Sequence, residues 1–265
     1  IKNKVVAEKY YDSIVPYIDI DIKGKALYKN RLMMLDVIAN NNWKRPIYFS
    51  PGAFDDEDYL WMKNYLQLDG MVYRLIPVKN TIPKDGSPLE MGQIDSEKMY
   101  NIVMKWDWGN SDSDKIYHDP ETRRESITYR SNLSRLMNQL IAEGQNDKAR
   151  KIIDLAMTKM PFEKYGYYSL LDPFASGYYK IGEKAKAQDL LKKLINKYKE
   201  NLNYYGKLKA SEQTGVAYDI ITDIERYRGL LQVMKENNDL TFYNESRKTF
   251  NTYTDMFERF GREKE

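Results

Sequence analysis

Two short segments, EGQNDKA at residues 143–149 and IGEKAKA at residues 181–187, decide how the centre of this sequence folds. Gly144 in the first segment and Gly182 in the second lie 38 positions apart. After each glycine, apolar residues recur at the i, i+3, i+4, i+7 and i+8 spacing that places them along one side of a helix. Glycine accepts the left-handed backbone that ends a helix, so each segment predicts a bend between two helices.

The helix before the first bend shows the same apolar spacing, and the flanking residues extend the pattern. Asp119-Pro120 and Asp172-Pro173 are typical helix starts, with aspartate as the N-cap and proline in the first turn. Repeated units of this kind are typical of tetratricopeptide-type proteins, whose period is about 34 residues. Residues 215–235 and 240–260 predict a divergent third hairpin that closes the stack. The alternative is two unrelated hairpins that align by chance.

The first 110 residues have a different pattern, with short apolar runs between glycine, proline and asparagine. The expected elements are strands at residues 17–22, 46–50 and 71–78, and helices at residues 27–38, 55–68 and 95–106. Strand, helix and strand in succession predict a βαβ unit. The predicted fold is therefore α+β and mainly α. A small α/β domain occupies residues 1–110, and a tetratricopeptide-like array of helical hairpins occupies residues 111–265.

Composition excludes several classes of function. The 42 basic and 39 acidic residues nearly cancel and are interspersed, so we expect no nucleic-acid partner. The chain has no cysteine, which excludes disulfides, thiolate metal sites and a cysteine nucleophile. No uncharged apolar run approaches the ~18 residues that span a bilayer. Because the sequence opens at Ile1 without a signal peptide, we expect a soluble piece of a longer protein.

No constellation of residues predicts catalysis, a cofactor or a metal. His118 is the only histidine, and no nucleophile can be paired with it. Residues 110–121 place oxygen ligands at positions 1, 3, 5 and 12 of a calcium loop, but Lys115 stands where that loop requires glycine. The acidic run at residues 55–58 is explained by the favourable end of a helix dipole. Glycine-rich phosphate loops are absent.

Tyrosine is abundant, with 23 residues, alongside four tryptophans. An aromatic ring with a hydroxyl offers both apolar area and a polar group, which suits recognition of sugars and proteins. Most of these rings are expected to fill seams between helices. Seven residues are the candidate contacts for a ligand or partner: Tyr168, Tyr178, Tyr179, Tyr204, Tyr205, Trp43 and Arg45.

Three blocks of sequence resemble a known family: NWKRPIYF at residues 42–49, YLQLDGMVYRLIPV at residues 65–78 and YHDPETRR at residues 117–124, followed by residues 133–149. They resemble the C-terminal soluble region of domain-of-unknown-function family 2723, bacterial multi-span membrane proteins that are similar to protein O-mannosyltransferases. The resemblance implies a position on the periplasmic side of the membrane. It also implies that the lipid-linked sugar donor and the catalytic acid belong to an N-terminal membrane module, so no catalytic residue maps onto this sequence.

Together these observations predict a non-catalytic accessory domain of a membrane glycosyltransferase-like protein. Its helical repeats would present a concave surface to an acceptor protein or glycan, and its second partner would be the transmembrane module of the same chain. One alternative is a protein-interaction scaffold of a cell-envelope complex unrelated to sugar transfer. Another is a free-standing enzyme in the α/β half, for which no acid, base or nucleophile can be named.

Overall fold

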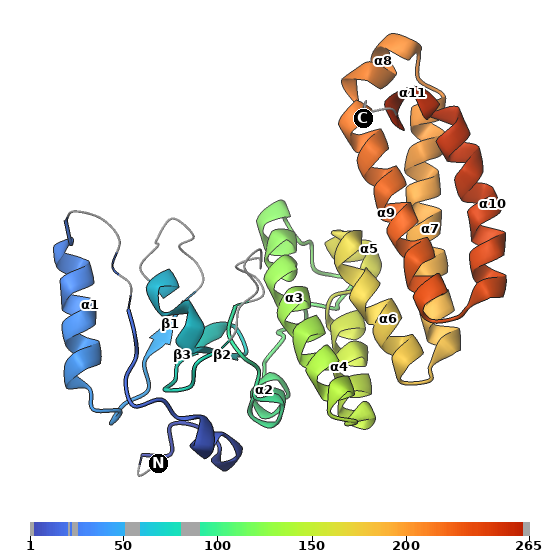
Figure 1. Cartoon of the computed structure of the whole chain (residues 1–265). Coiled ribbons are helices and arrows are strands. Elements are labelled where there is room, and N and C mark those ends of the chain that lie inside the picture. The colour runs from blue at the N-terminus through green and yellow to red at the C-terminus, as the bar shows by residue number, and fades with distance from the viewer. Residues whose placement is uncertain (1–2, 21, 23–25, 51–58, 81–90, 262–265) are drawn as a thin grey trace. The chain divides into compact units, whose positions relative to one another are not determined.

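The computed structural model describes residues 3–20, 22, 26–50, 59–80 and 91–261. Internal contacts divide the chain into two compact units, Ile1–Gly109 and Asn110–Glu265. The protein is mainly helical with one small antiparallel sheet, so the expected α+β, mainly α class is confirmed (Figure 1). In the ranges described here, no helix combines the length and the apolar character needed to cross a bilayer.

The first unit holds the sheet and short helices. Its elements are η1 (Glu8–Ser13), α1 (Lys29–Asn40), β1 (Tyr48–Phe49), η2 (Tyr59–Tyr65), β2 (Leu66–Asp69), β3 (Val72–Leu75) and α2 (Ser96–Val103), η denoting a 3-10 helix. The strand order is β1-β3-β2, and both neighbouring pairs are antiparallel. Asp95 accepts a hydrogen bond from the Lys98 backbone N–H and caps α2, which forms within the helix predicted at residues 95–106.

The predicted βαβ unit is wrong, because its two expected strands, observed as β1 and β3, pair antiparallel. Asp69 pairs with Val72, so only two residues connect β2 to β3, and the first of them, Gly70, has φ +73°. A two-residue connection reverses the chain and can only produce an antiparallel pair. The helix expected at 55–68 begins outside the described residues. Its described part is η2 followed by β2, because Leu66–Asp69 alternates apolar and polar residues as a strand does.

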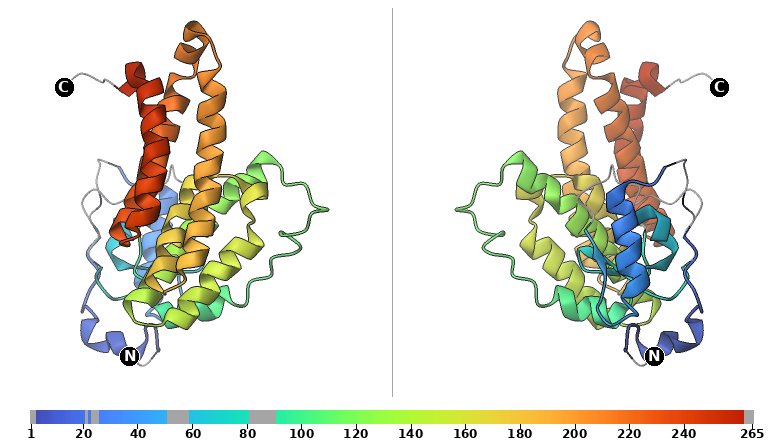
Figure 2. Two further views of the ribbon diagram at one scale, coloured as in Figure 1. Left: turned by 90° about the vertical axis from the view of Figure 1, so that its right-hand side faces the viewer. Right: turned by 90° about the vertical axis from the view of Figure 1, so that its left-hand side faces the viewer.

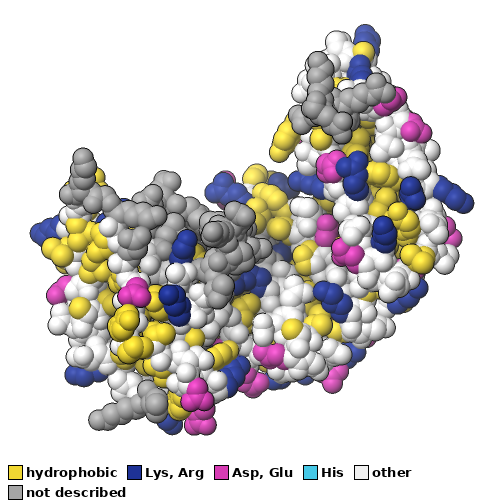
Figure 3. Space-filling model, viewed as in Figure 1, with side chains coloured by type: hydrophobic (Ala, Val, Ile, Leu, Met, Phe, Trp, Pro, Cys, Tyr) yellow, Lys and Arg dark blue, Asp and Glu magenta, His cyan; other side chains and the backbone are white. Residues whose placement is uncertain are grey.

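Two further expectations for this unit are corrected. The described residues of the stretch 17–22 form no strand. The strand expected at 46–50 is shorter than predicted and is not buried, since Tyr48 is 47% exposed. Helix α1 forms close to its predicted position but has no buried residue, and its Leu32, Met33 and Val37 side chains are 57–60% exposed. Figure 3 shows hydrophobic side chains gathered over this helix.

In residues 110–261, the described part of the second unit, every regular element is a helix. Its elements are α3 (Pro120–Ala142), α4 (Asn146–Lys159), α5 (Phe162–Tyr165), η4 (Tyr168–Leu171), α6 (Asp172–Lys180), α7 (Lys184–Gly206), α8 (Ala210–Gly215), α9 (Ala217–Glu236), α10 (Leu240–Met256) and α11 (Glu258–Gly261). Three helical hairpins, α3–α4, α6–α7 and α9–α10, follow one another along the chain (Figures 1 and 2).

The three bends have the same backbone geometry. Gly144, Gly182 and Asn238 stand at the bends with φ of +73°, +83° and +57°. In each, the N–H of the next residue donates to the carbonyl five positions earlier: Gln145 to Leu140, Glu183 to Tyr178 and Asp239 to Met234, at 2.8, 2.8 and 2.9 Å. This is the Schellman arrangement, in which a left-handed residue lets the next amide satisfy a free carbonyl of the helix end.

The hairpins pack in a regular order. First helices contact first helices, α3 with α6 and α6 with α9, and each second helix contacts the first helix of the next hairpin, α4 with α6 and α7 with α9. A Cβ added to Gly177 would clash with Met137, so the glycine permits the close approach of α6 to α3. The predicted apolar stripes form the core: Ala149, Ile152, Ile153, Ala156, Ala187, Leu190, Leu191 and Leu194 are at most 6% exposed.

The two predicted Asp-Pro helix starts have different outcomes. Asp119 caps α3 and accepts the Thr122 N–H at 2.9 Å, as expected. Asp172 does not cap α6, because η4 runs directly into the helix and the N-cap position falls on Leu171. Asp172 therefore has helical backbone angles, φ −55° and ψ −43°, while a capping side chain requires an extended backbone.

Candidate functional site

The seams between the hairpins are joined by one kind of contact that occurs twice. The residue after the second bend is Glu183, whose Oε1 accepts from Arg150 Nε at 2.8 Å. The residue after the third bend is Asp239, whose Oδ2 accepts from Gln188 Nε2 at 2.6 Å. Arg150 and Gln188 each lie six residues beyond the bend of the preceding hairpin. An acid at equivalent positions therefore ties each later hairpin to the second helix of the earlier one.

Asp239 makes the stronger of the two contacts. Its side chain is nearly buried, and it also accepts from the Tyr179 hydroxyl at 2.8 Å and pairs with Lys184 at 2.9 Å. Burial alone would raise the pKa of Asp239, but hydrogen bonds from Gln188, Lys184 and Tyr179 outweigh burial and hold the pKa below its usual value. The Tyr179 hydroxyl, a predicted ligand contact, is therefore engaged within the protein.

A groove of about 450 Å³ lies between α4, α5 and α7. We call it the α4–α7 groove. Apolar and aromatic side chains, including Met157, Phe162 and Leu190, line it together with charged side chains of both signs, including Lys186 and Asp189. Apolar surface bordered by a few polar groups is the usual composition of a binding site. The groove is the second unit's candidate binding surface.

One of the predicted tyrosines lines this groove, and a second contacts a residue that lines it. Tyr178 lines it, although the side chain is only 5% exposed and its hydroxyl donates to Asp154 Oδ1 at 3.0 Å. Lys186 Nζ lies over the Tyr178 ring, 5.5 Å from the ring centroid. Tyr168 is half-buried and stacks on Phe162, which lines the groove, with ring centroids 4.6 Å apart.

The other predicted contacts lie elsewhere. Tyr204, 61% exposed, and Tyr205 stand near the end of α7 with ring centroids 5.8 Å apart. Trp43 and Arg45 belong to the first unit. Trp43 is half-buried with φ +57°, and Arg45 is exposed, its backbone held by the Asn41 side chain. The seven candidates therefore do not form one site within either unit.

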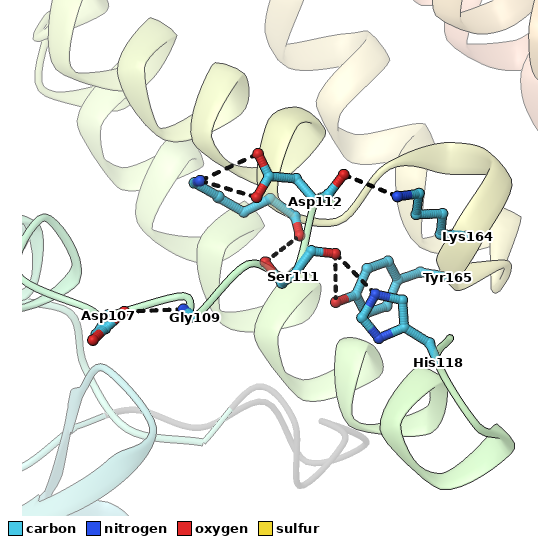
Figure 4. A network of polar contacts seen from close by, with 8 residues as sticks. Asp107, Gly109, Ser111, Asp112, His118, Lys164 and Tyr165 are labelled. Carbon is cyan, nitrogen blue, oxygen red and sulfur yellow. Dashed lines mark hydrogen bonds and ion pairs between the residues drawn. The ribbon is translucent and has the colours of Figure 1, made fainter. Parts of the chain in front are cut away.

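The segment that resembles a calcium loop is held by a different network (Figure 4). Asp112 pairs with Lys159 at 3.2 Å, and Asp114 pairs with Lys164 at 2.9 Å. A hydrogen bond from its own backbone and one from Lys159 hold the Asp112 pKa below its usual value. Both carboxylates pair with lysines, so these two positions of the calcium-loop template are already engaged within the protein. Among the residues that the structure places, no three potential metal ligands cluster.

His118 takes part in the same network. Its Nε2 lies 2.8 Å from the Ser111 carbonyl oxygen, which can only accept, so Nε2 carries the proton (Figure 4). The Tyr165 hydroxyl donates to the same oxygen at 3.4 Å, and its ring lies 4.5 Å from the imidazole. Ser111 Oγ donates to the Lys159 carbonyl at 2.8 Å. His118 thus closes the loop before α3 on itself, and Ser111 and Asp112 bond this loop to Lys159 at the end of the first hairpin.

Two buried charges were missed by sequence reasoning. Arg130 is fully buried without a carboxylate partner; its Nη1 and Nη2 donate to the Gly166 and Met160 carbonyls, and burial lowers its pKa to about 10. Asp172 has a buried Oδ1 without a hydrogen-bond partner, and burial raises its pKa to about 7 against the opposing effect of Arg226. Neither position interrupts the apolar spacing of its helix, so the sequence carries no signal for them.

The class of protein that this geometry defines is a helical-hairpin protein with a small α+β unit. The family model for TMEM260-associated domain 2 matches residues 1–98, which is less than half of the 265 residues. The match includes two of the blocks singled out above, residues 42–49 and 65–78. No curated protein and no solved structure matches the chain.

Proposed function

We propose that the second unit is a tetratricopeptide-like array and serves as a non-catalytic binding module for a segment of an acceptor protein or glycan. The observation that carries this proposal is the recurring contact between the acid after one bend and the second helix of the preceding hairpin. Because the two contacts are equivalent, each joins a hairpin to the preceding one in a similar position. Such stacking produces an extended surface built from many short elements, which is how solenoid proteins bind segments.

The α4–α7 groove is the proposed position of the bound segment. Its lining combines the aromatic rings of Phe162 and Tyr178 with lysine and aspartate side chains. Aromatic rings stack on the apolar faces of sugars and on aliphatic side chains. The mixed charges favour a segment without a strong net charge of its own. An unstructured peptide or a short glycan meets both conditions.

The proposed context is a membrane glycosyltransferase-like protein, with this chain on the periplasmic side. The resemblance of residues 42–49 and 65–78 to family 2723 supports this context. In this arrangement the sugar donor and the catalytic acid belong to a membrane module, and the hairpins hold the acceptor near it.

The binding proposal is tested by filling the groove. Ala185 is exposed and lines it, so Ala185→Trp places a large ring there without disturbing the buried side of α7. Ala142→Trp, at the exposed end of α3, is the matched control. Isothermal titration of the whole chain with unstructured peptides and neutral oligosaccharides should detect millimolar or tighter binding that Ala185→Trp removes and Ala142→Trp retains. Absence of binding, or equal binding by both variants, refutes the proposal.

A second candidate function is supported by α1. An exposed apolar row on a helix marks a protein or membrane contact more often than a free surface. In this alternative the Leu32, Met33 and Val37 side chains dock on the membrane module or another envelope protein, and the chain acts as a scaffold. Val37→Glu should then abolish co-purification with the membrane module while Ala185→Trp leaves glycan transfer unchanged. Unimpaired co-purification of Val37→Glu contradicts the scaffold.

A further inference from the structure

The sheet of the first unit carries a row of polar side chains on one face. The strand register places Tyr48, Arg74 and Gln67 next to one another across β1, β3 and β2, and an isolated bridge adds Gln93 beyond β2. Paired residues share a face, and neighbours along a strand point to opposite faces. The opposite face is apolar and buried, with Leu66, Leu68, Tyr73 and Leu75 at most 4% exposed. The polar row lies on the other face of the sheet, where Gln67 is buried, Arg74 and Gln93 are half-buried and Tyr48 is exposed.

Three atoms of this row are buried without a hydrogen-bond partner: Gln67 Oε1, Arg74 Nε and Gln93 Nε2. The Gln67 side chain is only 1% exposed. Buried polar groups are almost always hydrogen-bonded, and leaving one unpaired destabilises the fold. Three unpaired atoms in one row therefore call for a partner that enters from outside the chain.

The neighbouring contacts fix which atoms are free. Gln67 Nε2 donates to Asp69 Oδ1 at 2.7 Å, and Asp69 is paired in turn with Lys98. Reversing the Gln67 amide would set its oxygen against the Asp69 carboxylate, so the assignment holds. The row thus offers one acceptor, Gln67 Oε1, and two donors, Arg74 Nε and Gln93 Nε2. A partner must both donate and accept.

A cavity of about 670 Å³ opens over this row, and Gln67 and Arg74 line it. The segment from Lys4 to Tyr11 forms one wall, where Val6 packs on Ile76 and Val78. Four basic and three acidic side chains line the cavity, and Asp69, bonded to the lining Lys98, brings the acids to four. We call it the sheet cavity.

We propose that the sheet cavity binds a neutral polyhydroxylated molecule of mono- or disaccharide size. A hydroxyl group donates and accepts at once, so it satisfies both unpaired groups that line the cavity, the acceptor Gln67 Oε1 and the donor Arg74 Nε. The volume falls within the roughly 300–1,000 Å³ that small-molecule sites occupy. The balanced charge disfavours an anion such as phosphate, and the lysine partners of Asp69 and Asp95 disfavour a metal cation. The site belongs to the first unit and stands independently of the binding proposed for the hairpins.

The test uses the whole chain, labelled with ¹⁵N, and four probes: methyl α-glucoside, maltose, inorganic phosphate and calcium chloride. The glycoside or maltose should shift the amide and side-chain signals of Gln67 and Arg74 with millimolar affinity. Gln67→Met keeps the size of the side chain and removes the acceptor, which should weaken binding about tenfold, the equivalent of about 1.4 kcal/mol. Gln232→Met, the same change on the exposed face of α9, is the control.

A second variant keeps the test valid if Gln67→Met fails to fold. Asn101 is exposed on α2 where it lines the cavity, so Asn101→Trp blocks entry without touching the buried row. Loss of the shifts in Asn101→Trp, with the thermal transition unchanged, supports the site. Three results would overturn it: no shift at the row with either sugar, shifts with phosphate or calcium in place of sugar, or sugar affinity that Asn101→Trp leaves unchanged. The unpaired atoms would then be hydrated structural groups.

Discussion

Replacement of Asp172 by asparagine should stabilise the protein above neutral pH and have little effect in acid. Asp172 begins α6, and its buried Oδ1 has no hydrogen-bond partner. Burial raises the pKa to about 7 from an ordinary value of 3.8, while Arg226 partly opposes the shift. Asparagine has nearly the same shape and carries no charge. The substitution therefore removes the cost of an ionised carboxylate in a site that favours its protonated form.

The size of the expected change in unfolding free energy follows from the pKa shift of Asp172. Its sign follows because the folded state binds this proton more tightly than the unfolded chain does. A rise of about three pKa units corresponds to about 4 kcal/mol, taking about 1.36 kcal/mol per unit. The folded protein keeps this proton at pH values where the unfolded chain has lost it. The contribution of Asp172 to stability is thus fully present below about pH 4 and is lost as pH rises through about 7. The free energy of unfolding of Asp172→Asn should therefore exceed that of the parent by up to about 4 kcal/mol near pH 8. The two proteins should be equally stable near pH 4.

Urea unfolding at the two pH values, followed by far-ultraviolet circular dichroism, measures the difference directly. Asp189→Asn is the control, because its carboxylate lies exposed on α7 beside Lys193 and should respond little at either pH. A destabilised Asp172→Asn near pH 8 would refute the reasoning. So would a gain of the same size at both pH values, since either result means that the carboxylate is not held protonated by its surroundings.

Three further predictions concern the second unit, each measured by the same unfolding assay. Asp239→Ala should lower the free energy of unfolding by about 2–4 kcal/mol because it leaves buried partners unpaired. Glu183→Ala, at the more exposed seam, should lower it by under about 1 kcal/mol. Equal losses in the two variants would contradict this difference. Gly182→Ala should lower the free energy of unfolding by about 1–2 kcal/mol, because alanine is strained in the left-handed backbone of this bend. Asn238→Gly should be neutral or slightly stabilising. An unchanged stability of Gly182→Ala would be inconsistent with the bend. Arg130→Met should cost about 2–3 kcal/mol, since two backbone carbonyls lose their donors, and an unchanged midpoint would show that water replaces them.

The helices and bends of the second unit could be predicted because their signals are local. An apolar spacing of three and four residues specifies a helix, and Gly144 and Gly182 specify where each helix ends. The third bend uses Asn238, one of the few other residues that accept the left-handed backbone. Its two helices were predicted at residues 215–235 and 240–260, on either side of this bend. The class, α+β and mainly helical, follows from these elements.

The sheet could not be predicted correctly because its strands are short and two polar residues of β2, Gln67 and Asp69, are buried. Leu66, Gln67, Leu68 and Asp69 alternate over only four residues, too few to distinguish a strand from part of a helix. Burial of Gln67 and Asp69 depends on contacts with segments distant in sequence, above all with α2. A polar residue in a sequence is read as exposed, and only the tertiary structure reverses that reading.

The candidate sites were only partly accessible from sequence. Aromatic abundance drew attention to tyrosines, but the hydroxyls of Tyr178 and Tyr179 bond to aspartates within the protein. A better signal was present in the alignment of the bends, where the residue that follows the second bend is Glu183 and the one that follows the third is Asp239. An acid recurring at a bend, with a donor six residues after the preceding bend, indicates a contact between hairpins.

A chemical-shift map of the whole ¹⁵N-labelled chain, recorded with maltose and then with an unstructured peptide, tests most directly whether the protein is a binding module. The sugar should shift signals of the sheet cavity, the acceptor segment should shift signals of α4, α5 and α7, and both ligands should be recovered unchanged. Ligands that shift neither set of signals, or that are chemically altered by the purified chain, would contradict a protein that holds its partners without transforming them.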